Sequence, residues 1–240
     1  GRAVSSSIRS GLKLLTNRRN KLLQQEFEDQ EKHYFDDMLE RVNEGEELSE
    51  HEIETILASR PESQQALIEE LQLLSPVISE GEMLLQTMPI DSKGLHVLEM
   101  VKEVKERGEK MLLFANFRET VSYLNELLEN NGYRPLIITG AVPMNERNRI
   151  VEQITTDDRY TILIGTDAMG ESLNLQAASV EINYDVPWSP VAYIQRVGRI
   201  WRFGQKRKHL FIHNFLPSFK VERRVMEVML KKIETINEEF

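Results

Sequence analysis

The run YTILIGT at residues 160–166 is short, apolar and rich in β-branched side chains, and it ends in a turn-prone Gly-Thr pair. Segments with helical periodicity separate most runs of this kind in the chain. Short apolar strands that alternate with helices predict an α/β fold with a parallel sheet covered by helices on both faces. The other four runs are MLLFANF (111–117), RPLIITG (134–140), VEINYDVP (180–187) and LFIHNFLP (210–217).

The first 90 residues differ from the rest in charge and hydrophobic periodicity, and we expect them to form a helical region separate from the α/β domain at 91–240. Residues 1–24 are basic with leucines at helical spacing, whereas residues 26–82 are strongly acidic with further helical periodicity. An acidic stretch is more often a solvated surface than a site. The chemistry is therefore expected in the second part of the chain.

Composition restricts the class of protein. The 240 residues are 40% hydrophobic, enough for a sizeable core, and no apolar run approaches the roughly 20 residues that cross a bilayer. The absence of cysteine is compatible with a reducing cytoplasm, where we expect the protein to reside, and the five histidines are too scattered for a metal site. The formal net charge of -9 argues against nucleic acid as a partner, but this charge is segregated along the chain.

Polar and turn-prone residues follow the predicted strands. Ligands bind parallel sheets at the carboxyl ends of the strands, where glycine and threonine allow backbone amides to approach a phosphate. One such residue is a weak signal, but several at one edge predict a phosphate-binding surface. They are Asn116 and Arg118 at and just beyond the end of the run 111–117, Thr139 and Gly140 at the end of the run 134–140, and Thr166, Asp167, Gly170 and Glu171 at and beyond the end of the run 160–166.

The segment QRVGRIWRFGQ at 195–205 places arginines at 196, 199 and 202. If the segment is helical, this spacing brings them near one face, where like charges repel unless an anion lies opposite. A guanidinium group suits phosphate oxygens, so we interpret the segment as a phosphate clamp. A solvated basic face is the alternative. For Arg196, a structural salt bridge to Asp167 or Asp185 is as good an interpretation as a phosphate contact.

Residues 110–217 resemble the second RecA-like domain of superfamily 2 helicases and translocases, and more closely that of bacterial or phage members of the Swi/Snf-type ATPases. The amino-terminal SSSIRSGLKLLTNRRNKLL is similar to the helical segment that bacterial members place between the two motor lobes. The resemblance rests on KMLLFANFRET (motif IV), ITGAVPMNERNRIVEQI, GTDAMGESLNLQAASVEINYD (motif V) and QRVGRIWRFGQ (motif VI).

The resemblance implies a DNA-dependent ATPase in which ATP lies between two RecA-like lobes. Arg199 and Arg202 match the arginine fingers that reach the γ-phosphate. The implied partners are double-stranded DNA, whose phosphates are contacted without sequence readout, and the amino-terminal lobe of the same protein. The positions implied at the nucleotide are Gln195, Gly170, Glu171 and Asn174, and those implied at the nucleic-acid backbone are Asn116, Arg118, Thr139, Gly140 and Thr166.

The sequence contains neither a G-x-x-x-x-G-K-[ST] loop nor a DEAH-like box. We therefore expect this chain to be the carboxyl half of a motor that is inactive alone, with Mg²⁺ held by the absent lobe. Two alternatives are a strand-separating RNA or DNA helicase lobe and a non-catalytic module that binds nucleic acid or protein. Trp188 and Trp201 could stack on bases, but packing is the more common role of such side chains.

Overall fold

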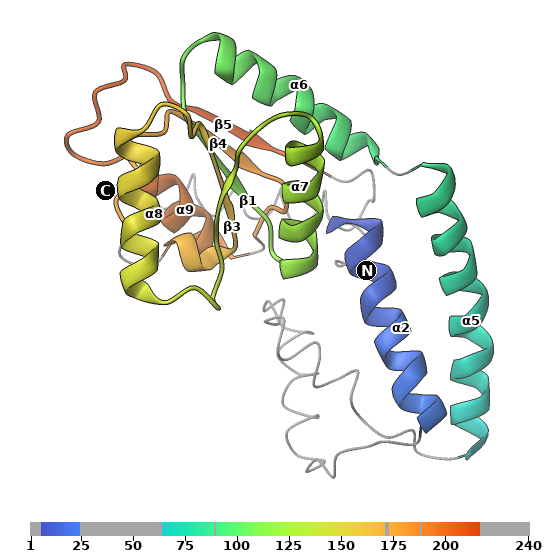
Figure 1. Cartoon of the computed structure of the whole chain (residues 1–240). Coiled ribbons are helices and arrows are strands. Elements are labelled where there is room, and N and C mark those ends of the chain that lie inside the picture. The colour runs from blue at the N-terminus through green and yellow to red at the C-terminus, as the bar shows by residue number, and fades with distance from the viewer. Residues whose placement is uncertain (1–5, 25–63, 89, 171–172, 188, 217–240) are drawn as a thin grey trace. The chain divides into compact units, whose positions relative to one another are not determined.

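The computed structural model describes residues 6–24, 64–88, 90–170, 173–187 and 189–216 (Figure 1). Contacts within the chain divide it into two units, Gly1–Pro89 and Ile90–Phe240. The acidic helices expected between 26 and 63 lie outside the described residues. So does a final helix, which the spacing of Val221, Val225, Val228, Met229 and Ile233 predicts. Within the described part of the chain, no helix has the length and apolarity needed to cross a membrane.

The first unit contains two helices that pack side by side, α2 (Ile8–Gln24) and α5 (Gln64–Thr87). Leu22, one of the leucines at helical spacing, is buried as the amphipathic pattern predicts. Arg18 of α2 holds the Glu70 carboxylate of α5 with two hydrogen bonds, from Nε at 2.6 Å and from the terminal nitrogen at 2.7 Å. This bidentate ion pair fixes the register of the two helices.

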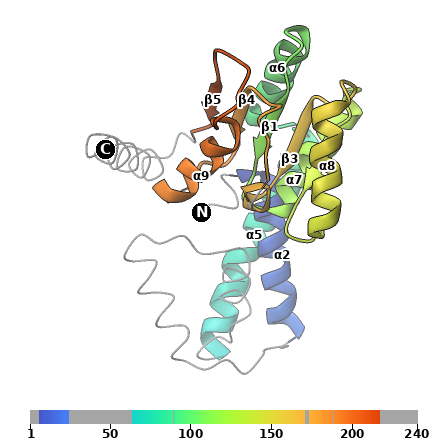
Figure 2. The ribbon, with the colours of Figure 1, turned by 90° about the vertical axis from the view of Figure 1, so that its left-hand side faces the viewer.

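The second unit is built on a five-stranded parallel sheet in the order β2-β3-β1-β4-β5. Each of the five apolar runs contains one strand, so the predicted α/β fold with a parallel sheet is confirmed. Figure 2 shows β5 next to β4, on the side of the sheet away from β3. The strands are β1 (Met111–Phe114), β2 (Leu136–Ile138), β3 (Ile162–Gly165), β4 (Val180–Asn183) and β5 (Phe211–Asn214).

Helices cover both faces of this sheet, and each face has its own apolar core. On one face α6 (Ser92–Glu106) and α7 (Arg118–Asn130) pack against Leu113, Ile164 and Ile182. On the other face α8 (Met144–Thr156) and α9 (Pro190–Ile200) pack near Leu112, Phe114 and Leu163. Strands buried on both faces explain why the runs read as continuous rather than alternating apolar sequence.

The entry to α6 ties this helix to the sheet. Asp91 caps the helix by accepting a hydrogen bond from the Gly94 amide at 2.6 Å. The same carboxylate accepts hydrogen bonds from the hydroxyl groups of Tyr123 at 3.2 Å and Tyr184 at 3.3 Å. A single side chain thus joins α6, α7 and the end of β4.

The register of the sheet aligns the carboxyl ends of the strands. Phe114 pairs with Gly165 on one side and with Asn183 on the other, and the row continues to Ile138 and Asn214. The loops that follow the five strands therefore start from one edge. This edge positions the candidate site.

Gly165 makes the approach of β3 to β2 possible. A Cβ atom there would overlap the Ile138 carbonyl oxygen and lie 2.7 Å from Cγ of Met169. We expect Gly165→Ala to lower the free energy of unfolding by about 2 kcal/mol, a typical cost of overpacking. Gly140→Ala is the matched control, because a Cβ at that position meets no atom within 4 Å. Chemical denaturation of both variants tests this, and equal stability of the two would contradict the steric argument.

Candidate nucleotide and nucleic-acid interface

Arg196 is the most buried charged side chain of α9, with a relative exposure of 1%. Its Nε donates to Asp167 Oδ1 at 2.6 Å, and one terminal nitrogen donates to Asn183 Oδ1 at 2.9 Å and to the Asp185 carbonyl at 2.7 Å. The other terminal nitrogen donates to Asn116 Oδ1 at 2.9 Å. Arg196 is therefore a structural residue: of the two interpretations of the sequence, the salt bridge to Asp167 is the one formed.

The partners of Arg196 come from the loops after three neighbouring strands. Asn116 follows β1, Asp167 follows β3 and Asp185 follows β4. The Asp185 carboxylate also joins the loops after β1 and β4, because it accepts a hydrogen bond from the backbone amide of Asn116 at 2.8 Å. It forms an ion pair with Lys93 at 3.4 Å. The Asn116 side chain, predicted to contact nucleic acid, thus uses its oxygen to hold Arg196.

Helix α9 ends at Ile200, so Arg202 lies beyond the helix. The expectation that the three arginines share one helical face is therefore wrong: Arg196 is buried, Arg199 is half-buried and Arg202 is exposed. The chain turns because Trp201 adopts a non-helical conformation at the carboxyl cap. Only the second and third arginines remain available to a ligand on the surface.

Arg199 is a cation whose Nε is buried and has no hydrogen-bond partner among the residues that the structure describes. Burial, and then the positive charge of Arg202, lower the pKa of Arg199 below its ordinary value. Both effects disfavour the guanidinium charge in the structure described, and an oxyanion placed beside the two arginines would relieve both. The pair is suited to bind a phosphate group.

The loop after α9 presents aromatic side chains to solvent. Trp201 is 74% exposed and Phe203 is fully exposed, so the expectation that Trp201 packs in the interior is wrong. The loop is nevertheless held firmly: Gln205 Nε2 donates to the carbonyls of Gln176, Ala178 and Ile200 at 2.9 to 3.2 Å. Gln176 in turn donates to the Phe203 carbonyl at 2.7 Å.

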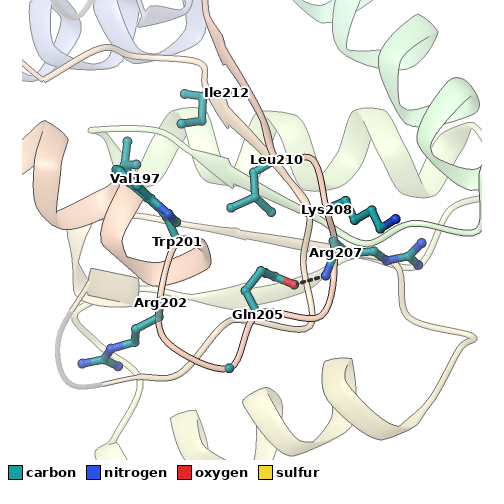
Figure 3. A pocket seen from close by; sticks show the side chains of 9 residues that line it. Val197, Trp201, Arg202, Gln205, Arg207, Lys208, Leu210 and Ile212 are labelled. Carbon is teal, nitrogen blue, oxygen red and sulfur yellow. Dashed lines mark hydrogen bonds between the residues drawn. The ribbon is translucent and has the colours of Figure 1, made fainter.

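A pocket of about 510 Å³ lies beside this loop (Figure 3). Val197, Leu210 and Ile212 contribute apolar lining, whereas Arg202, Arg207 and Lys208 contribute positive charge. Figure 3 shows Arg202 on the opposite side of the pocket from Arg207 and Lys208, with Gln205 between them. Arg207 is anchored away from the α9 arginines by donating to the Gly108 carbonyl at 3.1 Å.

The residues predicted to contact the nucleic-acid backbone start from the same edge of the sheet. Arg118 is exposed at the first position of α7, Gly140 is exposed after β2, and Thr139 and Thr166 are half-buried. The amide of Thr166 donates to the Ile138 carbonyl at 3.2 Å, which joins the loops after β2 and β3. These residues therefore lie along one edge of the sheet, because the strands that precede them, β2, β3 and β1, are neighbours.

The residues predicted to bind nucleotide are spread over two segments. Gln195 is exposed on α9, one turn before Arg199. Gly170 ends the short 3-10 helix η1 (Asp167–Gly170), which contacts α9, and Asn174 is exposed with its oxygen accepting from the Gln176 amide at 3.2 Å. Glu171 lies outside the described residues.

Two further polar side chains, Glu181 and Asn183, were missed in the sequence. They lie on β4, facing α9. Asn183 donates to Glu181 Oε1 at 3.1 Å and to Asn214 Oδ1 at 3.0 Å, while its own oxygen accepts from Arg196. Burial raises the pKa of Glu181 to about 7. The signal was a carboxylate and an amide at alternate positions of the buried strand VEIN, since a buried carboxylate is rarely tolerated without a partner.

Parts of this chain are similar in sequence to a known protein family and to known proteins. Residues 93–204 match the model of the helicase conserved C-terminal domain. An uncharacterized ATP-dependent helicase of Bacillus subtilis, YqhH, is 32% identical over 143 residues, which are 60% of this chain and 25% of that protein. The mouse (Mus musculus) DNA repair and recombination protein RAD54B is 31% identical over 126 residues, covering 52% of this chain and 14% of that protein.

A further relative and one solved structure are also similar to this chain. The DNA repair protein rhp54 of Schizosaccharomyces pombe is 29% identical over 141 residues, covering 58% of this chain and 16% of that protein. The chain thus spans about a quarter or less of the length of these relatives. The solved structure of the C-terminal part of the Fun30 ATPase domain superposes with a TM-score of 0.53 at 22% identity, covering 57% of this chain and 44% of that one. This last likeness shows the RecA-like fold.

The raised pKa of Glu181 predicts a pH-dependent stability. The folded state favours the protonated acid, so this stabilisation is complete below pH 4.5 or so and is lost as the pH rises through about 7. Glu181→Gln keeps the oxygen that accepts from Asn183 and removes the titration. At pH 8 we expect it to raise the free energy of unfolding by roughly 2 kcal/mol, with no gain at pH 4.5. Denaturation curves at both pH values test this, with the exposed Glu152→Gln as control; a gain independent of pH would refute it.

Proposed function

We propose that this chain is the second motor lobe of a DNA-dependent ATPase of the Swi/Snf type that translocates on duplex DNA. The match of residues 93–204 to the helicase conserved C-terminal domain and the similarity to an ATP-dependent helicase and a DNA repair and recombination protein support this proposal. The observation that carries the proposal is the pair Arg199 and Arg202. Arg202 lies just beyond α9, where its charge acts on Arg199, and the buried Nε of Arg199 meets no acceptor in the described part of the chain.

In this proposal the two arginines face a nucleotide bound by another lobe. Bound ATP supplies a γ-phosphate whose transfer spreads negative charge over its oxygens. Arg199 and Arg202 stabilise that charge, an effect worth roughly a thousandfold or more in rate. The described residues contain no group of three acidic or histidine side chains able to hold a metal ion, and we assign Mg²⁺ to the other lobe.

The proposed nucleotide site also includes residues near α9 and the loop after β3. Gln195 lies on the same helix as Arg199, and Gly170 ends the 3-10 turn that contacts this helix. We assign Gln195, Gly170, Glu171 and Asn174 to the nucleotide. Because Arg196 of α9 binds Asp167, a movement of α9 would displace the loop that follows β3.

The nucleic-acid surface is proposed at the carboxyl edge of the sheet. Arg118, Thr139, Gly140 and Thr166 would contact phosphates, which orient a strand without reading its bases. Gly140 faces open space, so its backbone is accessible to a phosphate oxygen. Asn116 is assigned a supporting role through Arg196. The cysteine-free sequence is compatible with a reducing cytoplasm, where we propose that the protein works.

The partner proposed for the loop after α9 is the amino-terminal RecA-like lobe of the same protein. Trp201 and Phe203 are large apolar side chains held in solvent next to the two arginines, an arrangement typical of a surface that another protein surface covers. The helical unit at the amino terminus would lie between the two lobes in sequence.

ATP turnover by the full-length protein, with and without duplex DNA, tests the proposed function. We expect duplex DNA to stimulate turnover without strand separation. Appreciable unwinding, or stimulation by RNA alone, would favour a strand-separating helicase. Duplex binding without ATP turnover would favour a non-catalytic binding module.

The finger assignment predicts that Arg202→Ala in the full-length protein lowers kcat about a thousandfold, while the dissociation constant for ATP changes less than about threefold. The reason is that the guanidinium group acts on charge that develops in the transition state. Lys208→Ala removes a cation from the same pocket and is the control, expected to retain turnover. Surviving turnover in Arg202→Ala would show that the assignment is wrong.

Trp201 is predicted to contribute to lobe association and not to folding. Because it is largely exposed, Trp201→Ala should leave the melting temperature of this chain within about 2 °C and weaken binding to the separately produced amino-terminal lobe about tenfold. Val191→Ala removes an exposed apolar side chain near the other end of α9 and serves as control. Calorimetric titration measures both, and equal affinities would place the interface elsewhere.

A further inference from the structure

Arg147 on α8 is a buried arginine that binds main-chain oxygens of two separate loops. Its relative exposure is 7%. Its Nε donates to the Val142 carbonyl at 2.7 Å, and its terminal nitrogens donate to the carbonyls of Gly140 and Ala168, each at 3.3 Å. Val142 and Gly140 belong to the loop after β2, whereas Ala168 belongs to the 3-10 turn after β3.

Burying a guanidinium group costs free energy unless its donors are satisfied, and three of the hydrogen bonds that Arg147 donates go to carbonyl groups of the main chain. A planar fork can reach acceptors on both sides at once, whereas an ammonium group at the end of a flexible chain cannot hold the same three. Arg147 therefore fixes the spacing between the two loops. Arg149, two residues along the same helix, is exposed and provides a natural comparison.

The two loops that Arg147 joins carry Thr139, Gly140 and Thr166, three of the residues that we assign to the nucleic-acid backbone. The loops also touch directly, through the hydrogen bond from the Thr166 amide to the Ile138 carbonyl and through the close approach at Gly165. The guanidinium group extends this contact from the strand ends to the loops themselves.

Arg147 also sets the direction of one peptide group. Because a trans peptide is planar, the N–H of Ala141 points opposite to the carbonyl of Gly140. That carbonyl accepts from Arg147, so the N–H faces away from the guanidinium group, and Ala141 itself is exposed. A peptide N–H directed in this way can donate to a phosphate oxygen.

We propose that Arg147 is a positioning residue for nucleic-acid binding: it holds the loops after β2 and β3 at the spacing needed to contact phosphates of one strand, and it does not itself touch the nucleic acid. This inference rests on the proposed function of the chain. A buried guanidinium group bonded to carbonyls neutralises no phosphate. Its removal should therefore weaken binding without changing how binding depends on salt.

The test compares Arg147→Lys with Arg149→Lys in the full-length protein, using the duplex-DNA concentration that half-saturates ATP turnover at several salt concentrations. We expect Arg147→Lys to raise that concentration about tenfold, the cost of a lost hydrogen bond to a charged group. kcat at saturating DNA, KM for ATP and the salt slope should stay unchanged. Arg149→Lys should resemble wild type, and Arg118→Ala should lower the salt slope by about one.

Hydrogen exchange separates local positioning from a general loss of stability. In Arg147→Lys, amides at 139–142 and 166–170 should exchange faster, while those of β1 and β3 keep their wild-type protection. Faster exchange throughout the sheet, an unchanged half-saturating DNA concentration, or a salt slope lowered by about one would each overturn the inference. Absence of DNA-stimulated turnover in the wild type would instead overturn the proposed function, and the inference with it.

Discussion

The buried charge of Arg196 is the constraint on which the second unit depends. A guanidinium group without access to water must find oxygen acceptors, and Arg196 finds them after β1, on and after β4 and after β3. Helix α9 can therefore dock in one register only, with the loops at the carboxyl edge already in place. Loss of any one of these acceptors would leave a buried donor unpaired, which is why the network behaves as a unit.

The position of Arg196 determines what the neighbouring arginines can do. Arg199 lies on the same helix but is only half-buried, and Arg202 lies beyond the helix, which ends at Ile200. Arg199 retains an unpaired donor, and Arg202 extends into solvent beside Trp201. One short segment thus provides a structural cation, Arg196, and two cations, Arg199 and Arg202, that we propose to bind ligand.

Much of the fold was predictable because apolar periodicity is a local property. Each of the five runs contains a strand, and the pairing of Arg196 with Asp167 was one of the interpretations that the charges of the sequence offered. The exposure of Trp201 was not, because burial depends on what the chain places opposite a side chain. The partners of Arg147 and Glu181 depend on strand order, which brings together segments that lie far apart in the sequence.

The loop after α9 has a thermodynamic consequence. Its aromatic side chains are exposed to water on a loop that two glutamines hold: Gln205 of the loop donates to carbonyls outside it, and Gln176 donates to the Phe203 carbonyl. A flexible loop with the same residues would lose backbone freedom on association, at a cost of roughly 1 kcal/mol or more per residue. Here that ordering takes place during folding. The loop is preorganised, so a larger share of the apolar surface buried on contact can appear as affinity.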